Sequence, residues 1–433
     1  MEKDTHLSEN IRTNNRQGLF SSLAQNMVGP FTGIYALKLG ASNMQVAMLS
    51  SLPALLALVG MIPGSLLVER QRNKKLTTAL LLLGTRSFYL FMAAVPFFPE
   101  AYRPALLVAA VALMNLPGAI AGVAWQSMMA GVIPEAQRGR AFAQRNQYMV
   151  VAGTVAVLIT GRLLDLLGHP AGYQVFFGLA FLMALGEAGF LLQLREASSL
   201  TQVNPSSSDP EALPENLVRP EDGRPQSHLA FLSNTRLGGR QNRPYLDFLG
   251  STLLLYFGWQ MGWPLFLKYQ VTLLGANNSW LSYFNLASAV VSFFGYPLWG
   301  QFSDKRGARV ALIYASAGLG LVPVFFSLST SLYQILLINI YTGFVASGLN
   351  LLLFNGLLEV TPEDGRTTHI AFYNTLVNLS ATIAPVVAMA LYDRIGVHQA
   401  LYVASAFRFL GAAAIYLKNN GARRLLQKET PTG

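Results

Sequence analysis

The chain has 433 residues, of which 52% are hydrophobic and 12% are charged, with a net charge of +10 and no cysteine. Soluble domains carry about 25% charged residues, so this composition excludes an ordinary soluble protein. The missing cysteine excludes disulfides and thiolate metal sites. The charges are clustered, and the apolar stretches between them are long enough to cross a bilayer as helices. We therefore expect an all-α polytopic membrane protein.

Twelve such stretches follow one another along the chain. The predicted spans are 17–39, 43–67, 75–97, 104–132, 141–167, 173–194, 245–269, 278–300, 309–330, 332–358, 368–392 and 398–418. The span at 141–167 is the weakest prediction because it begins with polar and charged residues, and a helix on the membrane surface is the alternative there. We expect no cleavable signal peptide, because the first 16 residues are polar.

The only long polar segment, residues 195–244, is rich in serine, proline and glutamate. Such a composition buries too little apolar surface to offset the entropy lost on ordering, so we expect a mostly disordered linker. The linker separates an N-terminal half of six spans, residues 1–194, from a C-terminal half of six spans, residues 245–433.

The two halves repeat one another. VIPEAQRGRAFAQRN at 132–146 aligns with VTPEDGRTTHIAFYN at 360–374 at a constant offset of 228 residues (362 minus 134). The offset pairs Glu135 with Glu363, Arg138 with Arg366, Asn146 with Asn374 and Asp165 with Asp393. Each stretch leads into the fifth span of its half, so the pattern indicates duplication.

Most of the 31 lysines and arginines lie in the terminal segments and in alternate loops. These loops are 68–75, 133–145, 195–244, 301–309 and 359–367. By the positive-inside rule, this asymmetry places both termini in the cytoplasm, and we expect the cytoplasmic (inner) membrane of a bacterium. It also accounts for the net charge without nucleic acid. The expected partners are the lipid bilayer and a small-molecule substrate, and the expected state is a monomer.

Two further loops correspond between the halves. GQFSDKRGARVAL at 300–312 and GSLLVERQRNKKL at 64–76 each follow the second span of a half. The first resembles the signature loop of the major facilitator superfamily, Gly-x-Leu-x-Asp-Arg-x-Gly-Arg-Arg. The matching residues are Gly300, Asp304, Gly307 and Arg309, and Lys305 keeps the charge of the first arginine. The other copy is degraded: Gly64 matches, Glu69 stands one position late, and Arg72 keeps the basic character.

With twelve spans and a long central loop, this resemblance covers nearly the whole chain. It implies two six-helix halves, with spans 1, 4, 7 and 10 lining a pathway and spans 2, 5, 8 and 11 beside them. It also implies a secondary transporter that works by alternating access. A carboxylate near a helix N-terminus is stabilising, so Asp304 would favour the outward-open state if span 11 approaches it when the cytoplasmic side closes. The alternative for this loop is a topology anchor.

Polar and aromatic side chains in or beside the pathway are candidates for the substrate cavity, because facing lipid would cost them free energy. They are Gln25, Asn26, Asn115, Trp125, Gln126, Tyr256, Trp259, Gln260, Trp263, Asn350, Asn374 and Asn378. Amides and aromatic rings suit a neutral or amphipathic organic substrate. The alternative role for each amide is hydrogen bonding between helices.

Charged and glycine residues at the cytoplasmic ends are candidates for a gate, with anchoring at the head groups as the alternative. They are Gly64, Glu69, Arg72, Glu135, Arg138, Arg145, Gly300, Asp304, Lys305, Gly307, Arg309, Glu363 and Arg366. Three charges lie within spans. Arg86 and Glu187 differ in depth by about 7 Å, and we favour a structural ion pair over a proton site, on spans that the resemblance places outside the half. Arg408 has no evident acidic partner.

The sequence therefore predicts export of a small neutral or amphipathic organic molecule. The alternatives are import of a sugar or other nutrient, and a non-transporting sensor of the same family. A coupling proton or other ion is possible in this family, but no titratable acid stands at mid-depth in the pathway spans. We expect no enzyme, cofactor or metal, because the five histidines lie in loops or at span ends.

Overall fold

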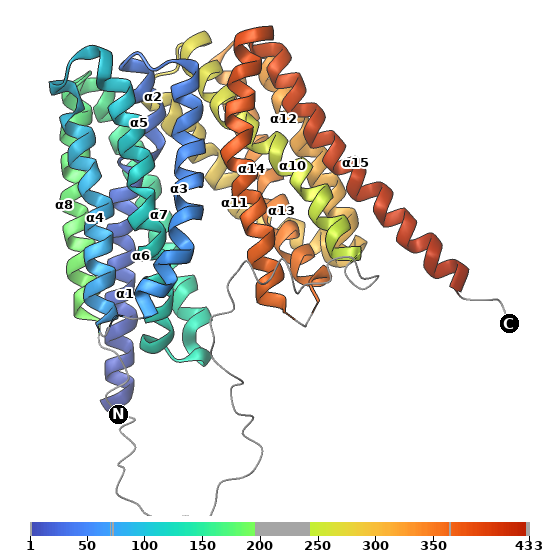
Figure 1. The fold of residues 1–433 in the computed structure, drawn as a ribbon, viewed down its shortest axis with the longest axis horizontal. Coiled ribbons are helices and arrows are strands. Elements are labelled where there is room, and N and C mark those ends of the chain that lie inside the picture. The colour runs from blue at the N-terminus through green and yellow to red at the C-terminus, as the bar shows by residue number, and fades with distance from the viewer. Residues whose placement is uncertain (1, 70, 72, 195–242, 363–364, 430–433) are drawn as a thin grey trace, which may run out of the picture.

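The computed structural model describes residues 2–69, 71, 73–194, 243–362 and 365–429 (Figure 1). Within these ranges the chain is almost entirely helical and contains no strand, so the predicted all-α fold is confirmed. Residues 195–242, which make up most of the predicted linker, lie outside the described residues.

The twelve predicted spans correspond to helices with two interruptions. The N-terminal bundle contains α1 (Glu2–Asn26), α2 (Gly29–Lys38), α3 (Asn43–Glu69), α4 (Lys74–Ala94), α5 (Arg103–Leu113), α6 (Asn115–Val132), α7 (Glu135–Leu167) and α8 (Ala171–Gln193). The C-terminal bundle contains α10 (Arg243–Lys268), α11 (Asn278–Arg306), α12 (Ala308–Leu328), α13 (Leu332–Val360), α14 (Arg366–Ile395) and α15 (Val397–Glu429). Short turns η1 (Val95–Phe97) and η2 (Glu100–Tyr102) precede α5, and the π-helical η5 (Tyr269–Leu273) continues α10.

The first span is split between α1 and α2, and the fourth between α5 and α6. The fifth span is one continuous helix, α7, so its polar start does not form a separate surface helix. Nine helical segments among the described residues are long and apolar enough to cross a membrane. The spans outside this set are α1–α2, α10 and α11. The protein is a multi-pass membrane protein.

The helices form two bundles that stand side by side (Figure 1). In the N-terminal bundle α1 packs against α7 and α8, and α3 and α4 pack against α6. In the C-terminal bundle α10 and α12 pack against α15, and α11 and α12 pack against α13. The bundles meet where α3 packs against α14 and where α7 packs against α11. Both contacts join the second span of one half to the fifth span of the other.

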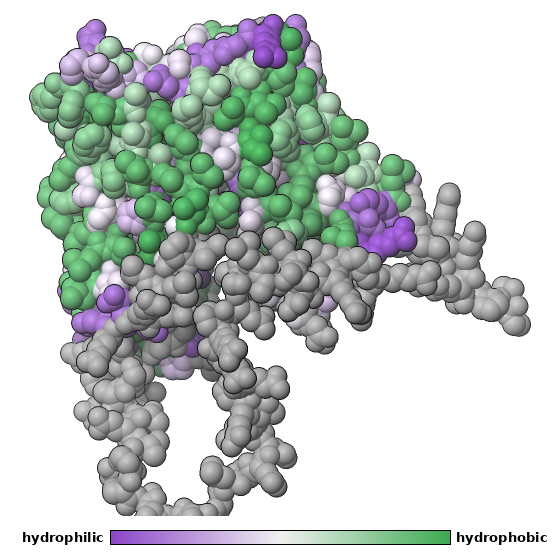
Figure 2. Space-filling view, in the orientation of Figure 1, coloured by the Kyte–Doolittle hydropathy of each residue, from purple (hydrophilic) through white to green (hydrophobic). Residues whose placement is uncertain are grey.

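The molecule has two ends. We call the end where α1 begins, α8 ends and α10 begins the terminal side. We call the opposite end, where α2 ends and α3 begins, the far side (Figure 1). Figure 2 shows a largely hydrophobic face with hydrophilic residues gathered towards the two ends. This distribution suits a chain whose middle section faces lipid tails.

The loop with the family signature is a tight helical hairpin. Only Gly307 separates α11 from α12, and its φ of 91° lies in the region that favours glycine. Arg309 Nη2 at the start of α12 lies 3.5 Å from Glu359 Oε1 near the end of α13. Asp304 and Lys305 are exposed at the terminal side.

Arg408 of α15 is fully buried, and the backbone rather than an acidic side chain satisfies it. Its Nε donates to the Gly258 carbonyl at 3.0 Å, its Nη1 to the Leu319 carbonyl at 2.9 Å and its Nη2 to the Trp259 carbonyl at 3.3 Å. Leu319 stands four residues before Pro323, which has no N–H to donate. Arg408 therefore supplies the hydrogen bond that this proline removes from α12.

The substitution Arg408→Met should lower the thermal midpoint of the purified protein, because the Leu319 carbonyl would lose its donor inside the bundle. An unsatisfied buried carbonyl costs about 1–3 kcal/mol. Adding Pro323→Ala restores the backbone N–H and should recover part of the loss. Thermal unfolding of the single and double variants in detergent measures this, and an equal loss in both would contradict the assignment.

Candidate functional site

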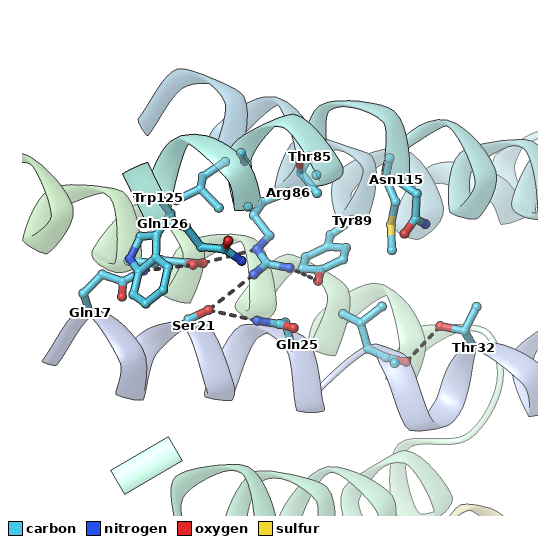
Figure 3. Close-up of a pocket in the computed structure, with 18 of the residues that line it drawn as sticks. Gln17, Ser21, Gln25, Thr32, Thr85, Arg86, Tyr89, Asn115, Trp125 and Gln126 are labelled. Atoms are coloured by element: carbon cyan, nitrogen blue, oxygen red, sulfur yellow. Dashed lines mark hydrogen bonds and ion pairs between the residues drawn. The ribbon is translucent and has the colours of Figure 1, made fainter. Parts of the chain in front are cut away.

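A cavity of about 450 Å³ lies within the N-terminal bundle (Figure 3). Residues of α1, α2, α4, α6, α7 and α8 line it, so it is a space between helices rather than a groove on the surface. Its volume falls in the range of small-molecule sites, about 300–1,000 Å³. Of the residues predicted for a substrate cavity, the structure places four on its wall: Gln25, Asn115, Trp125 and Gln126.

Arg86 and Glu187 form an ion pair on the wall of this cavity. Arg86 Nε donates to Glu187 Oε2 at 3.2 Å, and the two residues are 7% and 1% exposed. Arg86 Nη1 also donates to the Tyr89 hydroxyl at 2.7 Å, and Nη2 donates to Ser21 Oγ at 3.5 Å (Figure 3). The spans that carry this pair therefore turn these two side chains towards the cavity.

Arg145 joins the same wall from α7. Its Nη2 donates to Gln17 Oε1 at 3.0 Å, and Gln17 Nε2 donates in turn to Glu187 Oε1 at 3.3 Å. Its guanidinium carbon lies 4.6 Å from the centre of the Trp125 ring. Gly18 makes room for it, because a Cβ there would lie 2.8 Å from Arg145 Cγ. Arg145 is a residue predicted for a cytoplasmic gate, and in the structure it also lines the cavity.

Two predicted amides offer oxygen atoms to the cavity. Gln25 Nε2 donates to Ser21 Oγ at 2.9 Å, and Asn115 Nδ2 donates to the Val111 carbonyl at 2.7 Å. Their carbonyl oxygens accept no hydrogen bond from any described residue. Each is thus an acceptor that a ligand hydroxyl or amine can reach.

The remaining predicted cavity residues lie elsewhere. Gln260 is buried and bonds to α14, donating to the Val377 carbonyl at 3.2 Å and accepting from Ser380 Oγ at 2.6 Å. Asn26 donates to the Ser22 carbonyl at 2.9 Å and lies close to Gly153 of α7. Both amides therefore act between or within helices, which was the alternative role.

The aromatic and amide residues of α10, α13 and α14 do not come together with the cavity. The rings of Tyr256 and Trp259 stack with centroids 5.8 Å apart, and Trp263 is 46% exposed. Asn350 and Asn374 are exposed, and Asn378 Nδ2 donates to the Asn374 carbonyl at 3.0 Å.

The repeat pair Arg138 and Arg366 makes equivalent contacts in the two bundles. Arg138 Nε donates to the Ile133 carbonyl at 2.9 Å, where α6 ends. Arg366 Nη2 donates to the Leu358 carbonyl at 3.1 Å, near the end of α13. Each arginine therefore satisfies a carbonyl near the end of the preceding helix.

Two glycines predicted for the gate lie on spans. Gly64 is buried, and a Cβ there would lie 2.6 Å from Ile120 of α6, so α3 and α6 approach closely. Gly300 is half-buried on α11. The side chains of Glu69 and Glu135, and the residues Arg72 and Glu363, lie outside the described part of the structure.

On the far side the two bundles are joined through Asp165 at the end of α7. Asp165 Oδ1 accepts from the backbone N–H of Asn278 at 3.1 Å and from Asn278 Nδ2 at 2.9 Å. Oδ2 accepts from the backbone N–H of Ser279 at 2.8 Å and from Ser279 Oγ at 2.6 Å. Because these N–H groups open α11, the carboxylate also faces the positive end of the helix dipole.

The repeat partner of Asp165 lies in the same position in the other bundle. Asp393, at the end of α14, accepts from Asn43 Nδ2, at the start of α3. Each aspartate thus contacts the first turn of the second span of the opposite half. Sequence analysis aligned the two aspartates and gave them no role, although their place at matched helix ends was the available signal.

We call these contacts at Asp165 and Asp393 the far-side closure. His169 lies beside it, in the turn between α7 and α8. Its ring lies 5.8 Å from that of Tyr35 and 5.9 Å from that of Tyr173. Burial, together with the charges of Lys38 and Arg103, lowers the pKa of His169 below its usual value. The imidazole is neutral at neutral pH, so the closure does not depend on a histidine charge there.

A bilayer-spanning helical protein with two related bundles and a small-molecule cavity has the architecture of a membrane transporter. The family model of the Major Facilitator Superfamily matches residues 17–241 and 248–432. The chain belongs to this superfamily, as the signature loop indicated. A search of curated proteins found no match.

Solved transporters share the fold at low sequence identity. A bacterial homologue of the human lysosomal transporter Spinster, in an inward-facing and unoccupied conformation, is 14% identical with a TM-score of 0.67, covering 99% of both chains. The nucleoside transporter NupG is 12% identical with a TM-score of 0.67, covering 94% of this chain and 98% of its own. A POT family transporter in complex with 5-aminolevulinic acid is 12% identical with a TM-score of 0.63, covering 94% and 95%.

The substitution Glu187→Gln should lower the thermal midpoint markedly, because it leaves the Arg86 charge without its counter-charge. Breaking a buried pair from one side costs about 3–5 kcal/mol. The double variant Arg86→Gln, Glu187→Gln should be more stable than Glu187→Gln alone. Glu100→Gln, which breaks an exposed pair with Arg103, is the control and should change stability by about 1 kcal/mol or less. If Glu187→Gln behaves like this control, the pair is not structural.

Proposed function

We propose that the protein is a secondary active transporter that exports a small amphipathic organic molecule by alternating access. Its halves are residues 1–194 and 245–433, and the N-terminal cavity is its substrate site. The terminal side is the cytoplasmic side of the inner membrane, as the positive-inside pattern indicates. The protein works as a monomer, and the coupling ion has no assigned residue.

One observation carries this proposal. The hydrogen bonds that join described residues of the two bundles lie towards the far side. Asp165 and Asp393 accept five of them, the Tyr173 hydroxyl donates to Asn278 Oδ1 at 2.8 Å, and Ser282 Oγ donates to the Val157 carbonyl at 2.9 Å. Alternating access requires that the closure on one side can break while the other side closes. Hydrogen bonds gathered towards one end of the interface between the bundles suit such rocking. The inward-facing conformation of the Spinster homologue supports the same interpretation.

Export is supported by the character of the cavity rather than by a measured direction. Its wall combines aromatic and apolar side chains, such as Trp125, Tyr89 and Leu82, with amide, hydroxyl and charged groups. A molecule with an apolar body can enter such a site from the cytoplasm or the inner leaflet.

The substitution Asp165→Asn should open the far side, because it removes the charge that faces the start of α11. The chain has no cysteine, and a Cβ added at Gly122 on the cavity wall meets no atom within 4 Å. Gly122→Cys is therefore a clean reporter. If the variant lowers the free energy that favours the closed far side by about one to two kcal/mol, labelling from the far side by a membrane-impermeant maleimide should rise about 5- to 30-fold.

The matched control is Asp247→Asn, which breaks an exposed contact with Lys418 at 2.9 Å on the terminal side. It should leave far-side labelling unchanged. Equal labelling in Asp165→Asn and in the parent reporter would contradict alternating access through this closure.

The substitution Asp304→Asn should act in the opposite direction. If Asp304 meets the start of α14 only when the terminal side closes, the variant loses stability in that state alone. Far-side labelling of the Gly122→Cys reporter should fall about two- to fivefold, in line with the 0.3–1 kcal/mol of an exposed charge at a helix N-terminus. Unchanged labelling would leave the loop as a topology anchor.

A further inference from the structure

Arg86, Arg145 and Arg408 are embedded within spans, and the protein itself satisfies two of these three arginines. Arg408 donates from all three side-chain nitrogens to backbone carbonyls. Arg86 likewise donates from all three, to Glu187, Tyr89 and Ser21. In both of these arginines, all three side-chain nitrogens therefore donate a hydrogen bond, which suits a structural role.

Arg145 is not satisfied in this way. Among the described residues its hydrogen bond is the one from Nη2 to Gln17, and Nε is buried with no partner. The neighbouring Trp125 Nε1 is also buried without a partner. Two adjacent N–H donors of one cavity wall therefore lack an acceptor, and a buried donor without an acceptor costs free energy.

The charges on the wall do not cancel. Arg86 and Arg145 contribute two positive charges and Glu187 one negative charge, which leaves one positive charge. Glu187 uses one oxygen for Arg86 and the other for Gln17, so Arg145 reaches it only through an amide. A single negative charge on a ligand would neutralise the wall.

We propose that the cavity binds the carboxylate of a small organic monoanion at Arg145, with the apolar body of the ligand against Trp125 and the apolar wall. A guanidinium matches the two oxygens of a carboxylate, which is why arginine recognises such groups. A monoanion rather than a dianion fits because it brings the net charge of the wall to zero. Sequence analysis expected a neutral or amphipathic substrate, and this inference keeps the amphipathic body and adds one negative charge.

This inference rests on the proposed function, because it takes the cavity as the substrate site. Its test uses the Gly122→Cys reporter and protection of that cysteine from a maleimide. The ligands are benzoate, phenylacetate and octanoate, each paired with its neutral amide, and phenyl phosphate as a dianion. Each pair shares a body and differs in charge, so a preference within a pair reports the carboxylate.

We compare the ligand concentrations that protect half of the cysteine from labelling. For at least one acid, this concentration should be about tenfold or more lower than for its amide, because a charged group strengthens the hydrogen bond. Arg145→Gln should abolish this preference, and Arg145→Lys should retain part of it. Arg140→Gln is the matched control, because it removes an exposed arginine from the same helix, and it should keep the preference. A cysteine at the exposed Gly139, outside the cavity, should show no protection.

Equal protection by acids and amides, or stronger protection by phenyl phosphate than by every carboxylate, would overturn the inference. So would a preference that survives in a folded Arg145→Gln variant, with folding checked by gel filtration and, if needed, by Arg145→Lys. Absence of any protection, in a chain whose far-side labelling still responds to Asp165→Asn, would reject the carboxylate site alone. A reporter that does not respond to Asp165→Asn would instead reject the proposed function.

Discussion

A polar group inside a bilayer has to find its partner within the protein, because lipid tails offer no hydrogen bonds. This constraint explains most of the unusual side chains in the chain. Arg408 takes up the carbonyl that Pro323 frees, and Gln260 joins α10 to α14. Among the buried side-chain atoms that lack a partner, Arg145 Nε and Trp125 Nε1 are informative, because both residues line the cavity.

The same constraint shapes the contact between the bundles. Four donors surround the carboxylate of Asp165, two of them from the backbone at the start of α11. The hydrogen bonds of this closure can be exchanged for hydrogen bonds to water when the far side opens. Duplication supplies the second copy of the device at Asp393, so each half contributes one acceptor and one helix start.

The sequence was sufficient for the fold. Span number and family follow from the spacing of charged loops and from GQFSDKRGARVAL, because hydrophobic length is a local property. The site was only partly predictable. Gln25, Asn115, Trp125 and Gln126 were found as polar or aromatic residues in pathway spans. Gln17, Tyr89 and Arg145 also line the cavity and were not predicted there, because rotation of a helix about its axis depends on neighbours that a single sequence does not reveal.

The cavity lies on the N-terminal bundle alone, and this has a consequence for how the protein can change over evolution. If this cavity is the substrate site, as proposed, substitutions that alter what is carried should be concentrated in the first 194 residues. The two halves can then differ in function while both keep the matched aspartates Asp165 and Asp393. Chimaeras that exchange whole halves between relatives should inherit their cargo preference from the first half.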